Sequence, residues 1–328
     1  MVDTTRAWLA VIFAGGLYAV ASGVLAAVLL GALRRKLLGP GDPAAESKPP
    51  SRVRRRLAAG VLALAGLQTL CVLWAFFVEP FWPQVDRLRI ETLKLAPNTR
   101  PVRLVLVADT HCDPRARTER RVPDLVRGLK PDVIVFAGDA VNSTDGLTTF
   151  KTLMTRLAEI APTWSVRGNW EAWWFKSLDL YSGTGVRDLG GKAVRVAAGE
   201  SEVWICGGVF GEEGERAAAL KGVPAGRFSI FVHHYPEVGA DVLRAGGADL
   251  ALGGDTHGGQ VRLPLVGPLV RISRSGEYFD IGAQRVGDGI LYVNRGLGME
   301  GGRAPRVRFM CRPEITLIEI APAGTVSR

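Results

Sequence analysis

Two long segments without a single charged side chain, residues 7–33 and 57–78, dominate the hydrophobic pattern near the start of the chain. A helix that crosses a membrane needs about 20 consecutive apolar residues, and both segments are long enough. A cleaved signal peptide is the alternative for the first segment, but its uncharged run exceeds the roughly 7–15 residues of a signal core. A buried core helix is a second alternative, but the first segment is apolar on every face and keeps no polar stripe. We therefore predict two transmembrane helices.

The loop between the two predicted helices is strongly basic. Between Arg34 and Arg56 it holds eight Lys and Arg around a stretch rich in Pro, Gly and Ala. Short loops dense in Lys and Arg stay in the cytoplasm, so the N-terminus and everything after residue 79 are expected on the other side of the inner membrane. An aromatic belt, typical of a membrane interface, follows the second segment: Phe76, Phe77, Phe81 and Trp82. We predict an anchor over residues 1–84 and a domain outside the cytoplasm over residues 85–328.

From residue 102 onward, short apolar runs alternate with amphipathic stretches in a β-α-β-α-β order. Residues 102–108, 133–137 and 164–166 predict strands, and residues 117–129 and 150–160 predict the helices between them. In the second helix, one core-facing stripe has helical spacing: Phe150, Leu153, Met154, Leu157 and Ile160. Further strands are predicted at residues 202–206, 228–232, 250–252, 261–263, 290–293 and 314–320. The pattern is that of an α/β fold.

Charge and cysteine content narrow the classes of partner. Residues 1–56 contain nine Lys and Arg against three Asp and Glu, so only +3 of the net charge of +9 remains for the other 272 residues. The basic excess fits a topology signal next to anionic lipid headgroups, and we expect no nucleic-acid partner. Apart from Cys71 in the second segment, the three cysteines form no Cys-x-x-Cys pair. Neither a disulfide framework nor a zinc ribbon is indicated.

All four histidines lie in short motifs built on Asp, Asn and Gly. The five motifs are Asp109-Thr-His111, Gly138-Asp139, Gly168-Asn169-Trp170-Glu171, His233-His234-Tyr-Pro236 and Gly253-Gly-Asp255-Thr-His257-Gly-Gly-Gln260. Each motif follows the C-terminal end of a predicted strand. Because ligands of open α/β sheets bind at that edge, we expect the five motifs to converge on one site.

The residue types in these motifs indicate a site for two metal ions. Asp, His and Asn suit divalent cations such as Mn, Fe or Zn, and a single ion rarely takes more than six ligands from a protein. The set has seven members, which fits two ions with a bridging carboxylate: Asp109, His111, Asp139, Asn169, His234, Asp255 and His257. For single motifs other interpretations remain, since an isolated Asp-x-His is often a surface pair and Asn169 can be a turn residue.

The five motifs in this order resemble the calcineurin-like metallophosphoesterase superfamily, in particular its membrane-anchored bacterial branch of the YkuE and YaeI type. The resemblance covers roughly residues 79–320, including Tyr292–Gly298 and Arg312–Leu317. It implies a four-layer α/β/β/α sandwich in which a metal-bridging hydroxide attacks phosphorus. It also implies that Asp109, His111 and His257 hold one ion, that Asn169 and His234 hold the other, and that Asp139 bridges them. His234 is assigned over His233 because it stands two residues before Pro236, as the family's ligand does.

Two positions depart from the family pattern. Asp255 stands where the superfamily usually has His, and the added negative charge favours Mn or Fe over Zn. Trp170 stands where related enzymes place a His that contacts the transition state or protonates the leaving group, and indole can do no acid-base chemistry. We therefore expect substrates with good leaving groups, unless His233 takes over this role. Alternatively, Trp170 belongs to an apolar wall for a lipid or a base, together with Trp173 and Trp174.

The sequence thus predicts a membrane-anchored dinuclear phosphoesterase that acts on a phosphodiester or a pyrophosphate, with a lipid-linked or surface-confined substrate. Asp139, Asn169, His233 and Trp170 occupy the predicted catalytic positions. The rival hypothesis is a catalytically weakened protein that binds or senses phosphate-bearing ligands. In that case Asp255 and Trp170 mark decay, but the retention of six other ligand positions argues against it.

Overall fold

The computed structural model describes residues 23, 52–212, 218–271, 275–300 and 306–324. The chain divides into two compact units, one of residues 3–76 and one that comprises residues 77–328 with the first two residues. Apart from Gly23, the predicted first transmembrane segment lies outside the described residues.

The second uncharged segment forms one continuous helix, α2 (Arg52–Phe77). It starts five residues before the predicted segment, so the basic residues at the end of the preceding loop belong to the helix. The stretch Ala59–Phe81 has a mean hydropathy of 2.2, and it is the one candidate membrane span among the described residues. Its large apolar side chains are exposed, with Leu64 at 64% and Leu67 at 59%. Length and composition therefore fit a membrane span.

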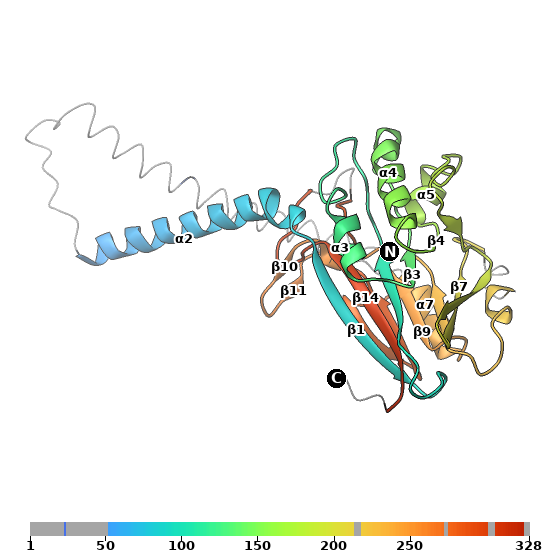
Figure 1. Cartoon of the computed structure of the whole chain (residues 1–328). Coiled ribbons are helices and arrows are strands. Elements are labelled where there is room, and N and C mark those ends of the chain that lie inside the picture. The colour runs from blue at the N-terminus through green and yellow to red at the C-terminus, as the bar shows by residue number, and fades with distance from the viewer. Residues whose placement is uncertain (1–22, 24–51, 213–217, 272–274, 301–305, 325–328) are drawn as a thin grey trace, which may run out of the picture. The chain divides into compact units, whose positions relative to one another are not determined.

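The domain that follows contains a first sheet of six strands in the order β1-β14-β2-β3-β4-β5 (Figure 1). The strands are β1 (Gln84–Thr92), β14 (Glu314–Pro322), β2 (Val102–Val107), β3 (Val133–Phe136), β4 (Thr163–Ser165) and β5 (Arg187–Asp188). Strands β2 to β5 are parallel, and β14 pairs antiparallel with β2 and parallel with β1. As the apolar runs predict, β3 is buried along its whole length, as expected of a strand covered on both faces.

A second six-stranded sheet has the order β12-β13-β9-β8-β7-β6. Its strands are β12 (Gly282–Val286), β13 (Gly289–Val293), β9 (Leu250–Gly253), β8 (Ser229–Val232), β7 (Ser201–Gly207) and β6 (Ala193–Ala198). The four central strands are parallel, and β12 and β6 pair antiparallel at the two edges. A separate hairpin consists of β10 (Arg262–Leu263) and β11 (Gly267–Pro268).

The two sheets pack face to face with helices on the outside. Leu104 of β2 and Ile230 of β8 belong to one buried cluster between the sheets. On the outer face of the first sheet, Val105 packs in a cluster with residues of α3 (Val122–Gly128) and α4 (Leu147–Ala158). On the outer face of the second sheet, Leu243 of α7 (Pro236–Arg244) belongs to another cluster. The layers are helix, sheet, sheet, helix, in the predicted order.

The predicted helix over residues 117–129 is too long, because α3 begins only at Val122. The Glu119 carboxylate accepts the backbone N–H of Arg117, which holds residues 117–119 in a turn. Pro123 stands in the first turn of α3, where its fixed φ angle favours a helix start. Local side-chain bonding therefore replaces the first turn of the predicted helix.

Candidate metal centre

Loops after five parallel strands bring the predicted ligands together. Asp109 and His111 follow β2, Asp139 follows β3, and Asn169 opens the short helix α5 (Asn169–Trp173) after β4. From the second sheet, His234 follows β8, and Asp255 and His257 follow β9. All seven side chains are buried, with exposed fractions between 0% and 7%. The carboxyl ends of both sheets therefore supply one buried polar cluster.

Two groups in this cluster have the spacing of metal ligands. One consists of Asp109, His111 and His257, and the other of Asp109, Asp139 and His234, with the ligand atoms in each group within 4.8 Å of one another. Nε2 of His111 lies 3.2 Å from Nε2 of His257 and 3.4 Å from Oδ2 of Asp139. Nε2 of His234 lies 3.3 Å from the same Asp139 oxygen. Asp139 thus stands between histidines of both groups.

Asp255 borders the cluster without belonging to either group. Its backbone N–H donates to Oδ1 of Asp109 at 2.9 Å, and its own Oδ1 lies 3.5 Å from Nε2 of His234. The Asp255 carboxylate therefore lies on the side of the group that contains His234. Asn169 is also buried in the centre, and its backbone follows Gly168 directly.

The ligand loops have unusual backbone conformations. Five of the seven predicted ligands have positive φ angles: Asp109 (48°), His111 (39°), Asp139 (59°), Asp255 (69°) and His257 (50°). L-residues rarely adopt this region, and each instance costs on the order of 1 kcal/mol or more. Such strain persists where tightly packed surroundings hold the backbone, and here it turns several side chains toward one point.

Glycines allow the loops to approach each other this closely. A Cβ atom on Gly168 would lie 2.2 Å from Oδ1 of Asp139, and one on Gly254 would lie 2.3 Å from Oδ2 of Asp109. Both contacts are far shorter than a van der Waals separation. The glycines at motif positions 168 and 254 are therefore needed to leave space beside the ligand carboxylates.

The donor set fits divalent cations. Nδ1 of His234 is 2.7 Å from the carbonyl oxygen of Ala137, which fixes the proton on Nδ1 and leaves the Nε2 lone pair for a metal. Among the described residues, Oδ2 of Asp109, Oδ1 of Asn169 and Nε2 of His234 are buried without a hydrogen-bond partner. Burying an unpaired polar group costs about 1–3 kcal/mol. Bound cations would satisfy these three atoms.

Burial and mutual charge shift the pKa values of the cluster in opposite directions. Burial raises the pKa of Asp109 to about 7, although the charge of His234 acts against it. Burial also acts to raise the pKa of Asp139, but the nearby imidazoles of His234 and His111 outweigh it, so the Asp139 pKa is lowered. Burial, followed by the charge of His111, lowers the pKa of His257. Asp139 thus keeps its negative charge more readily than Asp109, and burial favours the neutral form of His257, which a metal ligand requires.

Trp170 and His233, which the sequence also places at catalytic positions, lie at the border of the cluster. The Trp170 ring packs edge-on against His111, with ring centroids 4.9 Å apart, and its backbone N–H donates to Oδ1 of Asp139 at 3.0 Å. His233 is absent from both ligand groups. Its Nδ1 accepts the backbone N–H of Tyr235 at 3.0 Å, and its ring stacks on Phe210. His233, Phe210 and Tyr235 line a cavity of about 340 Å³.

Glu171 is a central residue to which sequence reasoning assigned no role. Its fully buried carboxylate accepts the backbone N–H groups of Asp139 at 3.0 Å, Ala140 at 2.7 Å and Gly168 at 2.6 Å. Burial and the nearby Asp139 charge raise the pKa of Glu171. The sequence signal was the Glu at the third position after Gly168, which is the spacing of a helix-capping box.

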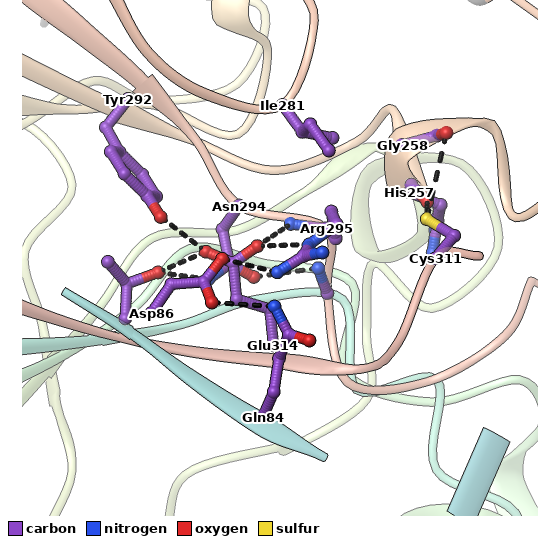
Figure 2. Close-up of polar contacts among 12 residues, drawn as sticks. Gln84, Asp86, His257, Gly258, Ile281, Tyr292, Asn294, Arg295, Cys311 and Glu314 are labelled. Carbon is purple, nitrogen blue, oxygen red and sulfur yellow. Dashed lines mark hydrogen bonds and ion pairs between the residues drawn. The ribbon is translucent and has the colours of Figure 1, made fainter. Parts of the chain in front are cut away.

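Figure 2 shows a network of polar contacts around Arg295 and Glu314. Arg295 donates to Glu314 at 2.6 Å and also bonds to Asp86, which ties β1, β13 and β14 together. The loop that follows Arg295 contacts the predicted ligand Asp109, because the backbone N–H of Gly298 donates to the carbonyl of Asp109 at 2.7 Å. Figure 2 also shows the thiol of Cys311, which donates to the carbonyl of His257 at 3.2 Å. No sequence motif predicts these long-range contacts.

Comparisons with known proteins agree with this arrangement. A family model described as calcineurin-like phosphoesterase matches residues 102–259, which include all seven predicted ligands. The chain is 28% identical to phosphodiesterase YaeI of Escherichia coli over 261 residues, which cover 74% of this chain and 90% of YaeI. It is 27% identical to the uncharacterized metallophosphoesterase YkuE of Bacillus subtilis over 275 residues, 80% of this chain and 93% of YkuE. A transmembrane protein with metallophosphoesterase domain from Danio rerio is 27% identical over 356 residues, 98% of this chain and 76% of that protein.

Proposed function

We propose that this chain is a dinuclear phosphodiesterase or pyrophosphatase. The premise is that it belongs to the calcineurin-like metallophosphoesterase superfamily and to the branch of YaeI and YkuE. Membership of this family supports hydrolysis of a phosphoester with the help of metal ions. The observation that carries the dinuclear proposal is the pair of buried ligand groups that share Asp109.

In this proposal Asp109, His111 and His257 hold one cation, and Asn169, His234 and Asp255 hold the other. Asp139 lies within 3.4 Å of histidines from both groups, which supports its role as the bridge. Divalent cations bound here would stabilise negative charge on phosphoryl oxygens and lower the pKa of a coordinated water toward neutrality. Three carboxylates in the set favour Mn or Fe over Zn.

The expected substrate class depends on whether a side chain near the metal centre can protonate the leaving group. Trp170 packs on His111 where a proton donor would be expected, and indole cannot serve as an acid. Substrates with good leaving groups, such as pyrophosphates and aryl diesters, need no such donor. His233 is the candidate substitute: because its Nδ1 accepts a backbone N–H, the neutral ring carries its proton on Nε2. The name of the relative YaeI, a phosphodiesterase, supports a diester substrate.

We further propose that residues 7–33 and 57–78 anchor the domain to the inner membrane with the metal centre outside the cytoplasm, facing a lipid-linked or surface-confined phosphoester. The apolar helix α2 and the transmembrane relative from Danio rerio support membrane attachment. The basic loop between the segments supports the orientation. A reporter fused to the C-terminus tests it, since a cytoplasmic signal would reverse the assignment.

The catalytic proposal is tested by hydrolysis of bis-aryl and mono-aryl phosphates by the full-length protein in detergent with added Mn²⁺. We expect diester cleavage that is lost in Asp139→Asn and kept in Asp241→Asn, a matched change at an exposed carboxylate on α7. Metal binding without turnover of either phosphate would favour a protein that senses phosphate-bearing ligands.

A further inference from the structure

The hairpin formed by β10 and β11 ends in a tip that exposes apolar side chains to solvent. Its residues Leu263–Val266, here called the hairpin tip, contain no polar side chain. Leu265 is fully exposed, at 109%, and Val266 is exposed by 60%. Leu265 also has a φ angle of 65°, an uncommon conformation for a leucine. Single exposed apolar residues are ordinary, but consecutive ones at a projecting tip indicate a contact surface.

The segment Phe309–Arg312 connects the base of the hairpin to residues 79–82, where the candidate membrane span finishes. At one end of this segment, the carbonyl of Phe309 accepts the backbone N–H of Arg262 in β10 at 2.9 Å. At its other end, the backbone N–H of Cys311 bonds to the Glu79 carboxylate, and the Arg312 guanidinium lies 4.1 Å from the ring of Trp82.

Glu79 belongs to the stretch Ala59–Phe81 that is apolar enough to span a membrane, and Trp82 follows it directly. Three exposed side chains near the end of the span are apolar or aromatic: Phe81 at 40%, Trp82 at 47% and Met310 at 52%. Aromatic residues are enriched where a span leaves the bilayer. The hairpin base is thus held by hydrogen bonds to the segment that contacts the end of the span.

We propose that the hairpin tip inserts into the interfacial region of the same bilayer that holds the anchor, with Phe81, Trp82 and Met310 on the same membrane-facing side. The occupant of the surface is a lipid bilayer rather than a second copy of the chain, because the chain itself delivers this end of the domain to the membrane. The inference rests on the membrane attachment in the proposed function. Shallow insertion of a few apolar side chains is a common mode of interfacial binding.

Insertion of the tip would bring the turn that carries His257, which packs against the base of the hairpin, close to the lipid surface. The hairpin follows directly on η4 (His257–Gly259), which supplies a predicted ligand. A Cβ atom on Gly259 would lie 2.6 Å from Cβ of Pro268, so the ligand turn packs against β11 without a gap. Arg262 of β10 also donates to the carbonyl of Gly258 at 3.2 Å. The arrangement fits a phosphoester whose alcohol component remains anchored in the bilayer.

Depth-dependent fluorescence quenching tests this proposal on the full-length protein in vesicles of phosphatidylethanolamine and phosphatidylglycerol. A polarity-sensitive fluorophore is attached to Leu265→Cys in a Cys71→Ser background, since Cys112, Cys206 and Cys311 are buried. The matched control is Leu93→Cys, which is 91% exposed and lies at the far end of β1. Nine residues of strand separate the two ends of β1 by about 30 Å.

We expect the emission of the Leu265→Cys label to shift to shorter wavelength, to be quenched by brominated lipid chains, and to resist aqueous iodide. The label at position 93 should show the opposite behaviour. Equal quenching of both labels by iodide overturns the proposal, and so does protection of the tip from both quenchers, which would indicate a protein partner.

The same preparations separate this inference from the proposed function. The variant Leu265→Asp should lose the lipid contact but hydrolyse a soluble bis-aryl phosphate at the unaltered rate, because position 265 lies outside the metal centre. Lipid quenching without any hydrolysis would contradict the phosphoesterase and leave the docking surface standing. Hydrolysis without lipid quenching would contradict the docking surface alone.

Discussion

The carboxylate of Glu171 accepts the backbone N–H of Asp139 at 3.0 Å, and with Ala140 and Gly168 it holds the loop that carries the proposed bridging ligand. The contact is to the main chain, so Glu171 positions Asp139 without competing with it for a cation. Residues that orient metal ligands in this way contribute to metal affinity although they do not touch the metal.

Replacing Glu171 with Gln should therefore weaken metal binding more than it affects the fold. An amide presents one acceptor oxygen and one N–H donor group, so at least one backbone N–H would lose its partner. We expect a loss of about 10–100-fold in Mn²⁺ affinity, measured by calorimetric titration. Glu200→Gln, at an exposed turn between β6 and β7, is the matched control and should bind as the unaltered protein does. Unchanged affinity in Glu171→Gln would contradict the positioning role.

The affinity for Mn²⁺ should rise with pH up to neutrality. Because burial raises the pKa of Asp109 to about 7, this carboxyl keeps its proton in the metal-free protein at pH 5, and a cation must displace that proton. Asp109 alone contributes about a tenfold gain per pH unit below its pKa. The pKa of Asp109 is higher in the folded protein than in the unfolded chain. The free energy of unfolding of the metal-free protein therefore falls as pH rises through about 7.

Titrations with Mn²⁺ at several pH values between 5 and 8 measure this dependence. Asp109→Asn should bind weakly and show a smaller slope, while Asp241→Asn should retain the full slope. An affinity that does not change between pH 5 and 7 would be incompatible with the raised pKa of Asp109.

Restoring a proton donor at Trp170 should broaden the substrate range. Trp170→His should accelerate hydrolysis of alkyl diesters, whose leaving groups are poor, and change aryl diesters little. A positioned general acid contributes about 10²–10⁴-fold, so a gain of about tenfold or more is expected even with imperfect geometry. Trp170→Phe keeps an aromatic ring beside His111 but cannot transfer a proton, and it should show no gain. Equal rates for the two variants on alkyl diesters would reject the leaving-group hypothesis.

Gly168→Ala should disrupt the centre through steric contact alone. The φ angle of Gly168 is −99°, which any residue adopts, but an added Cβ would lie 2.2 Å from Oδ1 of Asp139. We expect loss of metal binding and of diester hydrolysis. Gly128→Ala, in α3, has no atom within 4 Å of the added Cβ. It should keep both properties and gain roughly 0.5–1 kcal/mol in stability, as Ala does over Gly inside a helix. Normal metal binding by Gly168→Ala would contradict the described loop geometry.

Sequence reasoning located the central strands well because burial on both faces leaves a continuous apolar run. The run Val133–Phe136 is such a case, and its strand is buried at every position. The edge strand β1 (Gln84–Thr92) was not predicted, since it has no continuous apolar run and much of the strand is exposed. It is a strand because β14 pairs with it along its whole length, a partner more than 200 residues away in the chain.

The ligand loops could be predicted because each lies directly after a strand whose direction the pattern had already fixed. What the pattern could not supply is how the two sheets face each other, and hence that Gly298 of one loop bonds to the backbone of Asp109. The contact between Cys311 and His257 also depends on chain segments far apart in the sequence. The predicted helix start at Arg117 was wrong for a local reason, because the Glu119 carboxylate accepts the backbone N–H of Arg117 and competes with helix formation.

The metal content of the purified full-length protein tests the central claim most directly. Mass spectrometry of the metals should find two divalent ions per chain after loading with Mn²⁺ and removal of excess. Variants of the proposed second site, His234→Ala and Asn169→Ala, should retain about one ion, since Asp109, His111 and His257 remain as a complete group. One ion per chain in the unaltered protein, together with full diester hydrolysis, would contradict the dinuclear centre.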